Sequence, residues 1–121
     1  MVVLKKQEMG VLKQKALELF STSNIFHFGV NDRLDEYKKF YNNASVLSFL
    51  HDVDLVNTSL AFFENNLNIS QTSKKTFMHR NTLVYRIEKI KKTLALDIRV
   101  FSEAVIVENL IIFYKNNIQS K

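Results

Sequence analysis

The sequence predicts a mainly all-α fold, and three observations support this prediction. Proline is absent and glycine occurs only at Gly10 and Gly29, so residues that break helices are scarce in the 121-residue chain. Apolar residues recur at spacings of three and four over most of the chain, which is the period of an amphipathic helix. Hydrophobic residues make up 46% of the sequence and charged residues 24%, a balance typical of a protein with a packed core.

Composition excludes several kinds of site. Cysteine is absent, which rules out disulfides, thiolate zinc sites and cysteine nucleophiles. No apolar run approaches the roughly 18 residues that span a bilayer, and the chain begins with too early a charge for a secretory signal. Paired catalytic carboxylates and a nucleophile–base pair are not recognisable. We therefore expect a cytoplasmic protein that is not an enzyme and has no membrane contact, metal or cofactor.

Residues 1–51 are predicted to form a short helix-strand-helix segment. Apolar residues at helical spacing indicate one helix over about 2–20 and a second over about 33–50. Between them, the aromatic and β-branched run 25–30 is typical of a strand. A single strand cannot pair its own backbone edges, so this segment needs either a second chain or a larger sheet to which it belongs.

Residues 52–121 are predicted to form a second, helical domain. Its first helix covers about 53–66 and is capped by Asp52 or Asp54. Three further helices are expected: a short one from Asn68 or Ser70 to Phe77, one over 81–94, and one over about 102–115. The last of these is apolar on nearly all sides, so we expect it to be buried on several sides, in part by a second subunit.

The positive charge of the chain is concentrated in one short stretch. The net charge is +5 at pH 7, yet seven basic residues and a single acid lie between Lys74 and Lys92 and give that stretch alone a charge of +6. The rest of the chain is therefore close to neutral. A dense basic stretch is typical of proteins that bind polyanions such as nucleic acids, although a solvated helix face can carry the same charge.

The basic stretch coincides with a short helix, a tight turn at residues 78–80 and an amphipathic helix, which is the order of a helix-turn-helix. The second helix of that motif enters the major groove of DNA. At about 100° per residue, one arc of this helix is apolar and is predicted to face the core: Leu83, Ile87, Ile90 and Leu94. The opposite arc is polar and consists of Asn81, Tyr85, Glu88 and Lys92. Arg86 lies on the flank between the two arcs.

Ten residues are the candidate contacts to double-stranded DNA. Three lie in the first turns of the second helix, where base edges are met first: Asn81, Thr82 and Tyr85. Six cations are placed to neutralise phosphates: Lys74, Lys75, Arg80, Arg86, Lys89 and Lys92. The tenth, His79, is expected to bond to backbone or phosphate in the turn rather than to a metal.

Three residues of this surface have alternative interpretations. Asn81 can cap its own helix with its side-chain oxygen instead of contacting a base. Tyr85 can pack at the edge of the core, although its place opposite the apolar arc favours exposure. Glu88 would repel phosphate unless it pairs with Lys92 or accepts a hydrogen bond from a cytosine amino group.

A specific motif lies in the turn and the helix that follows it: His79-Arg80-Asn81-Thr82-Leu83, then Tyr85-Arg86. With its surroundings in residues 72–87, this motif resembles the C-terminal helix-turn-helix of the PucR/CdaR family of bacterial transcription regulators. The segments on either side are also similar to that family: Asn57-Thr58-Ser59-Leu60-Ala61-Phe62-Phe63 before the motif and Leu96-Asp97-Ile98-Arg99 after it. The resemblance covers about residues 53–115.

The chain departs from the family pattern at several positions. Ser73 and Thr76 stand where the family has alanine and leucine in the short helix. Ala95 replaces a glycine, and Val100-Phe101 replaces Asp-Pro. A polar Thr76 at a core position must find a hydrogen-bond partner, so we expect weaker packing between the two helices of the motif.

The resemblance implies that residues 52–121 are a sequence-specific DNA-binding domain and that residues 1–51 are the tail of the family's GGDEF-like middle domain. It also implies that effector sensing lies upstream, so we expect no small-molecule site here. A homodimer is expected, because one short recognition helix contacts too few bases for operator-level specificity. The alternative is a helical interaction module that has lost DNA binding and dimerises through the helix over 102–115 and the strand over 25–30.

Overall fold

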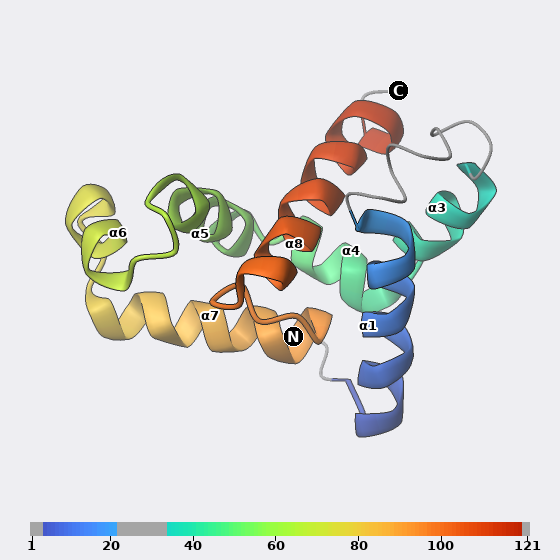
Figure 1. Ribbon diagram of the computed structural model, residues 1–121, viewed down its shortest axis with the longest axis horizontal. Coiled ribbons are helices and arrows are strands. Elements are labelled where there is room, and N and C mark those ends of the chain that lie inside the picture. Colours follow the sequence, from blue (N-terminus) through green and yellow to red (C-terminus); the bar gives the residue numbers. More distant parts are fainter. Residues whose placement is uncertain (1–3, 22–33, 120–121) are drawn as a thin grey trace.

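The computed structural model of the protein describes residues 4–21 and 34–119, and every regular element in these ranges is a helix (Figure 1). In chain order these are α1 (Lys6–Phe20), α3 (Leu34–Tyr41), α4 (Ala44–Leu50), α5 (Val53–Glu64), α6 (Ile69–Thr76), α7 (Arg80–Leu94) and α8 (Phe101–Phe113). A short π-helical segment, η2 (Tyr114–Gln119), continues α8. The mainly all-α class predicted from the sequence is confirmed.

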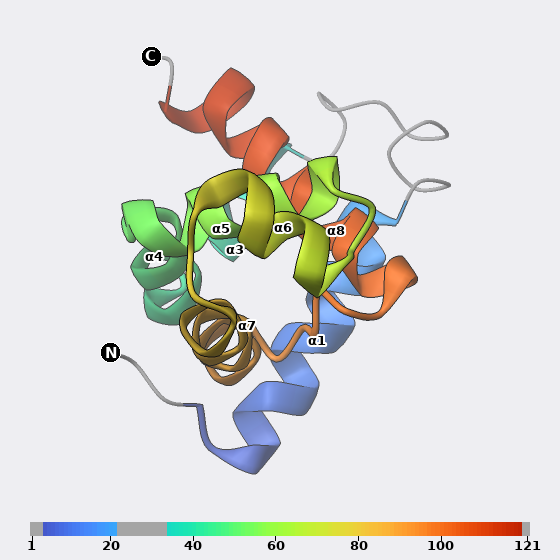
Figure 2. The same ribbon diagram turned by 90° about the vertical axis from the view of Figure 1, so that its left-hand side faces the viewer.

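Helix α7 joins the two ends of the molecule. Its N-terminal part lies beside α5 and α6, and its C-terminal part lies beside α4 and α1 (Figure 1). Helix α8 rises from the middle and packs on both α1 and α5. Figure 2, which looks along α7, shows α5 and α6 stacked above it. The short helix and the basic helix of the predicted motif are therefore neighbours in space.

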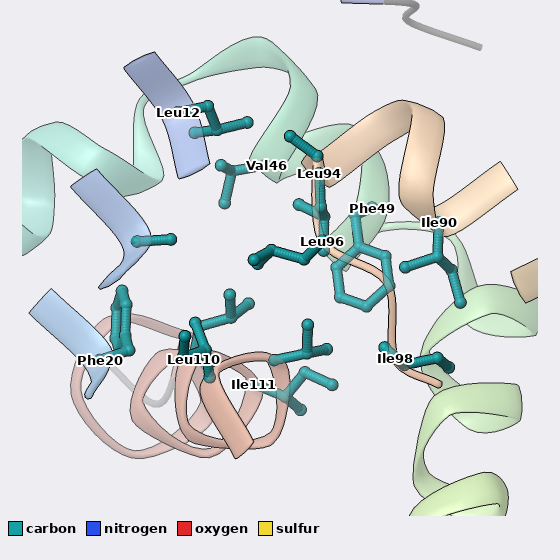
Figure 3. Close-up of a cluster of buried hydrophobic side chains, with 14 of the residues drawn as sticks. Leu12, Phe20, Val46, Phe49, Ile90, Leu94, Leu96, Ile98, Leu110 and Ile111 are labelled. Atoms are coloured by element: carbon teal, nitrogen blue, oxygen red, sulfur yellow. The ribbon is translucent and has the colours of Figure 1, made fainter. Parts of the chain in front are cut away.

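One continuous apolar core holds the helices together. Figure 3 shows a part of it, in which buried side chains of α1, α4, α7, α8 and the segment after α7 point toward one another: Leu12, Phe20, Val46, Phe49, Ile90, Leu94, Leu96, Ile98, Leu110 and Ile111. Residues 1–51 and residues 52–121 both contribute to this core. Because the two parts share this core, the structure does not separate them, and the division into a domain over 1–51 and a domain over 52–121 stays a prediction.

The N-terminal helices are attached to α8 through an aromatic cluster. Neighbouring rings of the cluster have centroids between 4.3 and 6.0 Å apart and belong to Phe20, Tyr37, Phe40, Tyr41 and Phe113. Aromatic pairs at such distances stabilise a fold beyond the burial of their surface alone. The cluster therefore fixes α1 and α3 on the last helix of the chain.

Three polar side chains of this region donate to buried backbone carbonyls. The Tyr41 hydroxyl donates to the Leu110 carbonyl oxygen at 2.6 Å, and the Tyr37 hydroxyl donates to that of Leu19 at 2.8 Å. Asn109 of α8 donates its side-chain amide to the carbonyl oxygen at the end of α1 at 2.9 Å. Burial, with the neighbouring tyrosines, raises the pKa of Tyr41, so its hydroxyl stays protonated and remains a donor.

The predicted organisation of residues 1–51 needs a correction. Its described part holds the helices α1, α3 and α4 and no strand, while the predicted strand over 25–30 lies outside the described residues. The helix expected over 33–50 is two helices. The chain breaks before α4 because the Asn43 side chain caps this helix by accepting from two backbone N–H groups of its first turn.

The helices of the C-terminal part begin and end close to their predicted limits. Asp52 caps α5 by accepting from the backbone N–H of Leu55 at 3.1 Å. Asn68 caps α6 by accepting from the backbone N–H of Gln71 at 2.8 Å. Of the two capping candidates at each site, the first along the chain is therefore the cap, and Asp54 lies inside the first turn of α5.

We expect Tyr41→Phe to lower the free energy of unfolding by about 1 kcal/mol, because it removes the buried hydrogen bond to Leu110 and keeps the ring. Urea unfolding followed by circular dichroism measures the change. Tyr114→Phe is the matched control, since Tyr114 also lies against this cluster, at 5.2 Å from the Tyr41 ring, and is only partly buried. Equal midpoints for the two variants would show that the Tyr41 hydroxyl does not stabilise the fold.

Candidate nucleic-acid interface

Helices α6 and α7 are joined by a turn of three residues, 77–79, and both pack on α5. The apolar arc predicted for α7 faces the core as expected, since its side chains are at most 1% exposed: Leu83, Ile87, Ile90 and Leu94. The opposite side of the helix is left to solvent. The predicted geometry of the motif is confirmed by this burial pattern.

The polar residues that depart from the family pattern find hydrogen-bond partners within the motif. The Ser73 hydroxyl donates to the carbonyl oxygen of Met78 in the turn at 2.5 Å. The Thr76 hydroxyl donates to the carbonyl oxygen of Thr72 one turn earlier at 2.8 Å. Both side chains are only partly buried. The departures therefore leave no unsatisfied polar group between the helices, and Ser73 ties α6 to the turn.

The N-terminus of α7 is capped by His79 and not by Asn81. The His79 Nδ1 atom accepts from the backbone N–H of Asn81 at 3.0 Å. His79 is thus the backbone-bonded turn residue that the sequence predicts. Asn81 lies inside the first turn of α7, and its exposed side chain makes no hydrogen bond to another described residue. The alternative that Asn81 caps its own helix is wrong.

The three residues predicted to read bases lie together on the exposed side of α7. Asn81 and Thr82 occupy its first turn, and Tyr85 follows one turn later with 64% of its surface exposed. The exposure predicted for Tyr85 is confirmed, so the alternative of a core-edge aromatic is wrong. Arg80 precedes them and donates to the Ser70 hydroxyl of α6 at 3.0 Å.

The predicted phosphate contacts divide into exposed and engaged cations. Lys74, Lys75 and Lys92 are exposed and form no ion pair within the described part of the chain. Arg86 and Lys89 instead turn toward α5, and each side chain is only 27% exposed.

The two engaged cations bind side chains of α5 and of its N-cap residue Asp52. Arg86 donates to the Thr58 hydroxyl at 3.2 Å and lies 3.8 Å from an Asp54 carboxylate oxygen. The Lys89 ammonium lies 3.7 Å from an Asp52 carboxylate oxygen. These contacts connect α7 to α5, and they agree with the predicted place of Arg86 on the flank between the buried and the exposed arc.

Glu88 pairs with Arg99 and not with Lys92. The Arg99 guanidinium donates to Glu88 at 2.7 Å and to both Asp97 carboxylate oxygens at 2.8 and 3.0 Å. Arg99 thereby gives a cationic partner to the acid that would otherwise repel phosphate, and it shares its charge between Glu88 and Asp97. Sequence reasoning missed this role, because Arg99 lies 11 residues from Glu88 and outside the predicted motif. Asp97 and Arg99 are two residues apart, and this spacing of an acid and a base was the only sign in the sequence of an ion pair at this place.

The same contacts shift the titration of both partners. The hydrogen bonds from Arg99 lower the pKa of Asp97 below its usual 3.8, against the opposing effect of burial. The hydrogen bonds to Asp97 and Glu88 raise the pKa of Arg99, so its charge is permanent. Asp97 and Arg99 are therefore both charged at neutral pH.

Other kinds of site are not visible where the chain is described. No group of three or more His, Cys, Asp or Glu residues there is placed to hold a metal ion. No single helix in the described ranges is long and apolar enough to cross a membrane, and α4 and α5 meet that test only as a pair bent by 72°. A groove of about 540 Å³ opens between α1 and α3, lined in part by Leu4, Val11 and Phe40, at the end of the molecule away from α6.

A short capped helix, a three-residue turn and a helix with one buried and one exposed polar face define a helix-turn-helix protein. Residues 55–109 match the family model described as the PucR C-terminal helix-turn-helix domain. This part of the chain is therefore a helix-turn-helix domain of the PucR type, and the resemblance seen in the sequence is confirmed for it.

Two proteins of Bacillus subtilis (strain 168) are each similar to about half of the chain. One is a purine catabolism regulatory protein, 38% identical over 66 residues, and the other is the uncharacterized protein YxkF, 38% identical over 60 residues. Each similarity covers 50% of this chain, but only 12% and 20% of the length of the two relatives. No solved structure matches the chain.

We expect Asp97→Asn to reduce stability at neutral pH and to leave it almost unchanged in strong acid. The folded protein holds the Asp97 carboxylate below its unfolded pKa, so the unfolded state binds this proton first as the pH falls. The stabilisation is complete above about pH 4 and is lost as the pH drops through the lower, folded pKa.

Urea unfolding of both proteins between pH 2 and 7 tests this expectation. The difference in unfolding free energy should shrink as the pH falls below about 4. Asp35→Asn, which changes an exposed carboxylate on α3, is the control and should follow the wild type. A difference that stays constant down to pH 2 would contradict the assigned role of Arg99.

Proposed function

We propose that residues 52–121 bind double-stranded DNA sequence-specifically as the DNA-binding part of a bacterial transcription regulator, with α7 in the major groove. The observation that carries this proposal is the exposed polar surface on the first turns of α7, formed by Asn81, Thr82 and Tyr85. The PucR-type match over residues 55–109 supports it independently. Residues 1–51 would then be the tail of a middle domain of the same regulator.

The phosphate contacts are assigned by availability. Lys74 and Lys75 at the end of α6 and Lys92 on α7 are exposed, so they can neutralise phosphates without breaking an existing contact. Arg80, the first residue of α7, and the turn residue His79 complete the proposed phosphate contacts, although Arg80 donates to Ser70 and His79 accepts from the backbone N–H of Asn81.

Arg86 and Lys89 belong to a second group. They reach a phosphate only if their ion pairs with Asp54 and Asp52 open. We therefore assign them first to holding α7 on α5, and only in second place to DNA.

Two copies of the chain would act together on one operator. The exposed first turns of α7 present three base-reading side chains, and a site of that size cannot give operator-level specificity alone. The relative named as a purine catabolism regulatory protein supports a regulatory role. Because that similarity covers 12% of the relative, it supports no particular pathway.

We expect the double variant Lys74→Ala/Lys75→Ala to weaken binding to every DNA sequence and to reduce the salt dependence of binding. Each phosphate contact contributes about −0.9 to the slope of log K against log salt, so the slope should become shallower by about 2. Fluorescence anisotropy with random-sequence duplex DNA at several salt concentrations measures both quantities.

The chain offers a matched control for that experiment. Lys38→Ala/Lys39→Ala removes the same charge from an exposed Lys-Lys pair of α3, at the other end of the molecule. This control should keep the wild-type slope. Equal losses in both double variants would mean that net charge alone drives binding. Absence of wild-type binding at low salt would favour the interaction module that has lost DNA binding.

Asn81→Ala and Thr82→Ala should relax sequence preference while preserving binding to random DNA. Each removes a base-edge contact, which is worth about 1–3 kcal/mol of discrimination. Arg80→Ala should instead weaken all sequences alike, because a phosphate contact carries no sequence information. The measurement is selection of preferred duplexes from a random pool by each variant, followed by affinities for the selected and random DNA. A uniform loss in all three variants would contradict this division of roles.

A further inference from the structure

Within the helix-turn-helix motif, Phe77 has an exposed side chain and a strained backbone that packing inside the protein does not explain. It lies in the turn between α6 and α7, and 96% of its surface is exposed. Its backbone is left-handed, with φ 56° and ψ 25°, at the C-cap of α6. Glycine is favoured at such a position, because a Cβ atom crowds the backbone there. The chain therefore holds a large apolar side chain in a strained conformation without burying it.

The other left-handed residues have a local explanation that Phe77 lacks. Ala95 ends α7 with φ 64°, but it is 8% exposed and its methyl group belongs to the core. Leu67 packs against the core, and Asn66 is of a type that tolerates this conformation. For Phe77, neither burial nor residue type offsets the strain. A strained and exposed side chain of this kind points to a role in binding.

Phe77 lies close in the chain to the residues proposed to contact DNA. Phe77 precedes Asn81 by four positions, so the two Cα atoms lie within about 14 Å of each other. The residues around it are cationic: Lys74 and Lys75 precede it, and Arg80 follows it. A polyanion would be drawn to this surface, and an aromatic ring at its centre needs an apolar group on that polyanion. In the major groove, that group is the C5-methyl of thymine.

We propose that Phe77 is a specificity-determining residue that places its ring against a thymine methyl group at the edge of the major groove. This inference rests on the proposed function, since it requires α7 to dock in that groove. The phosphate contacts on either side bring the ring to the base edges. The strain in the turn is then retained for recognition, and a glycine at this position would give a more stable but less selective protein.

The test is Phe77→Gly, compared with the wild type on duplex DNA selected by the wild type from a random pool. The variant should melt about 2–4 °C higher, because glycine relieves the left-handed backbone and no burial is lost. Its affinity should fall about fourfold, the ratio expected from one buried methyl group. Phe77→Asn, which also tolerates this backbone, should show the same loss of affinity and excludes turn flexibility as its cause.

Replacing thymine by uracil in the selected duplex removes the methyl groups and keeps the base pairing. The wild type should lose about fourfold more affinity from this replacement than Phe77→Gly does. Ala95→Gly, which relieves the same kind of backbone at the other end of α7, is the control and should keep the wild-type affinity and the wild-type thymine-to-uracil ratio.

Two outcomes would overturn the inference and leave the proposed function intact. One is wild-type affinity and an unchanged thymine-to-uracil ratio in Phe77→Gly. The other is a lower melting temperature of this variant, which would show that Phe77 stabilises the fold. Failure of the wild type to bind any duplex would instead refute the proposed function itself.

Discussion

The structure depends on one apolar stripe, the buried side of α7, which is shared by both halves of the molecule. Leu83 and Ile87 lie toward the N-terminal end of this stripe, and Ile90 and Leu94 toward the C-terminal end. Helices α5 and α6 gather around the first part, and α4 and α1 around the second. Because one helix serves both groups, its polar side is turned outward along its whole length. The candidate recognition surface is a consequence of that packing.

Electrostatic contacts then decide which charges of this surface are free. The basic stretch has a formal charge of +6, but two of its cations are held by carboxylates at the start of α5. Its single acid, Glu88, is held by Arg99 from outside the stretch. The free positive charge is thereby confined to the end of α6, the turn and the exposed side of α7. A count of charges along the sequence locates this surface. It does not show which cations are paired with carboxylates at the start of α5 and which are free to contact DNA.

Sequence reasoning was reliable where the signal was local and periodic. The buried arc of α7 and the exposure of Tyr85 follow from spacing and residue type, which also reduced the caps of α5 and α6 to two candidates each. It failed where the decisive contact is long-range or depends on a single turn. The Arg99 pair with Glu88 joins separate segments, and the break before α4 rests on one capping residue within an otherwise apolar, helix-like run. The left-handed backbone of Phe77 has no signature in the sequence, because glycine usually marks such a site.

Because α7 packs against other helices at both ends, the rotation of one end about the helix axis relative to the other is fixed. An α-helix advances by about 100° per residue, so inserting one residue between Ile87 and Ile90 would rotate its N-terminal face by that angle against its C-terminal end. Both ends are clamped by packing, so α7 cannot absorb such a change by turning as a whole. The number of residues in this helix therefore fixes the direction in which its exposed polar face points relative to α1 and α4. In chains built this way, substitutions along α7 are tolerated far more readily than insertions or deletions.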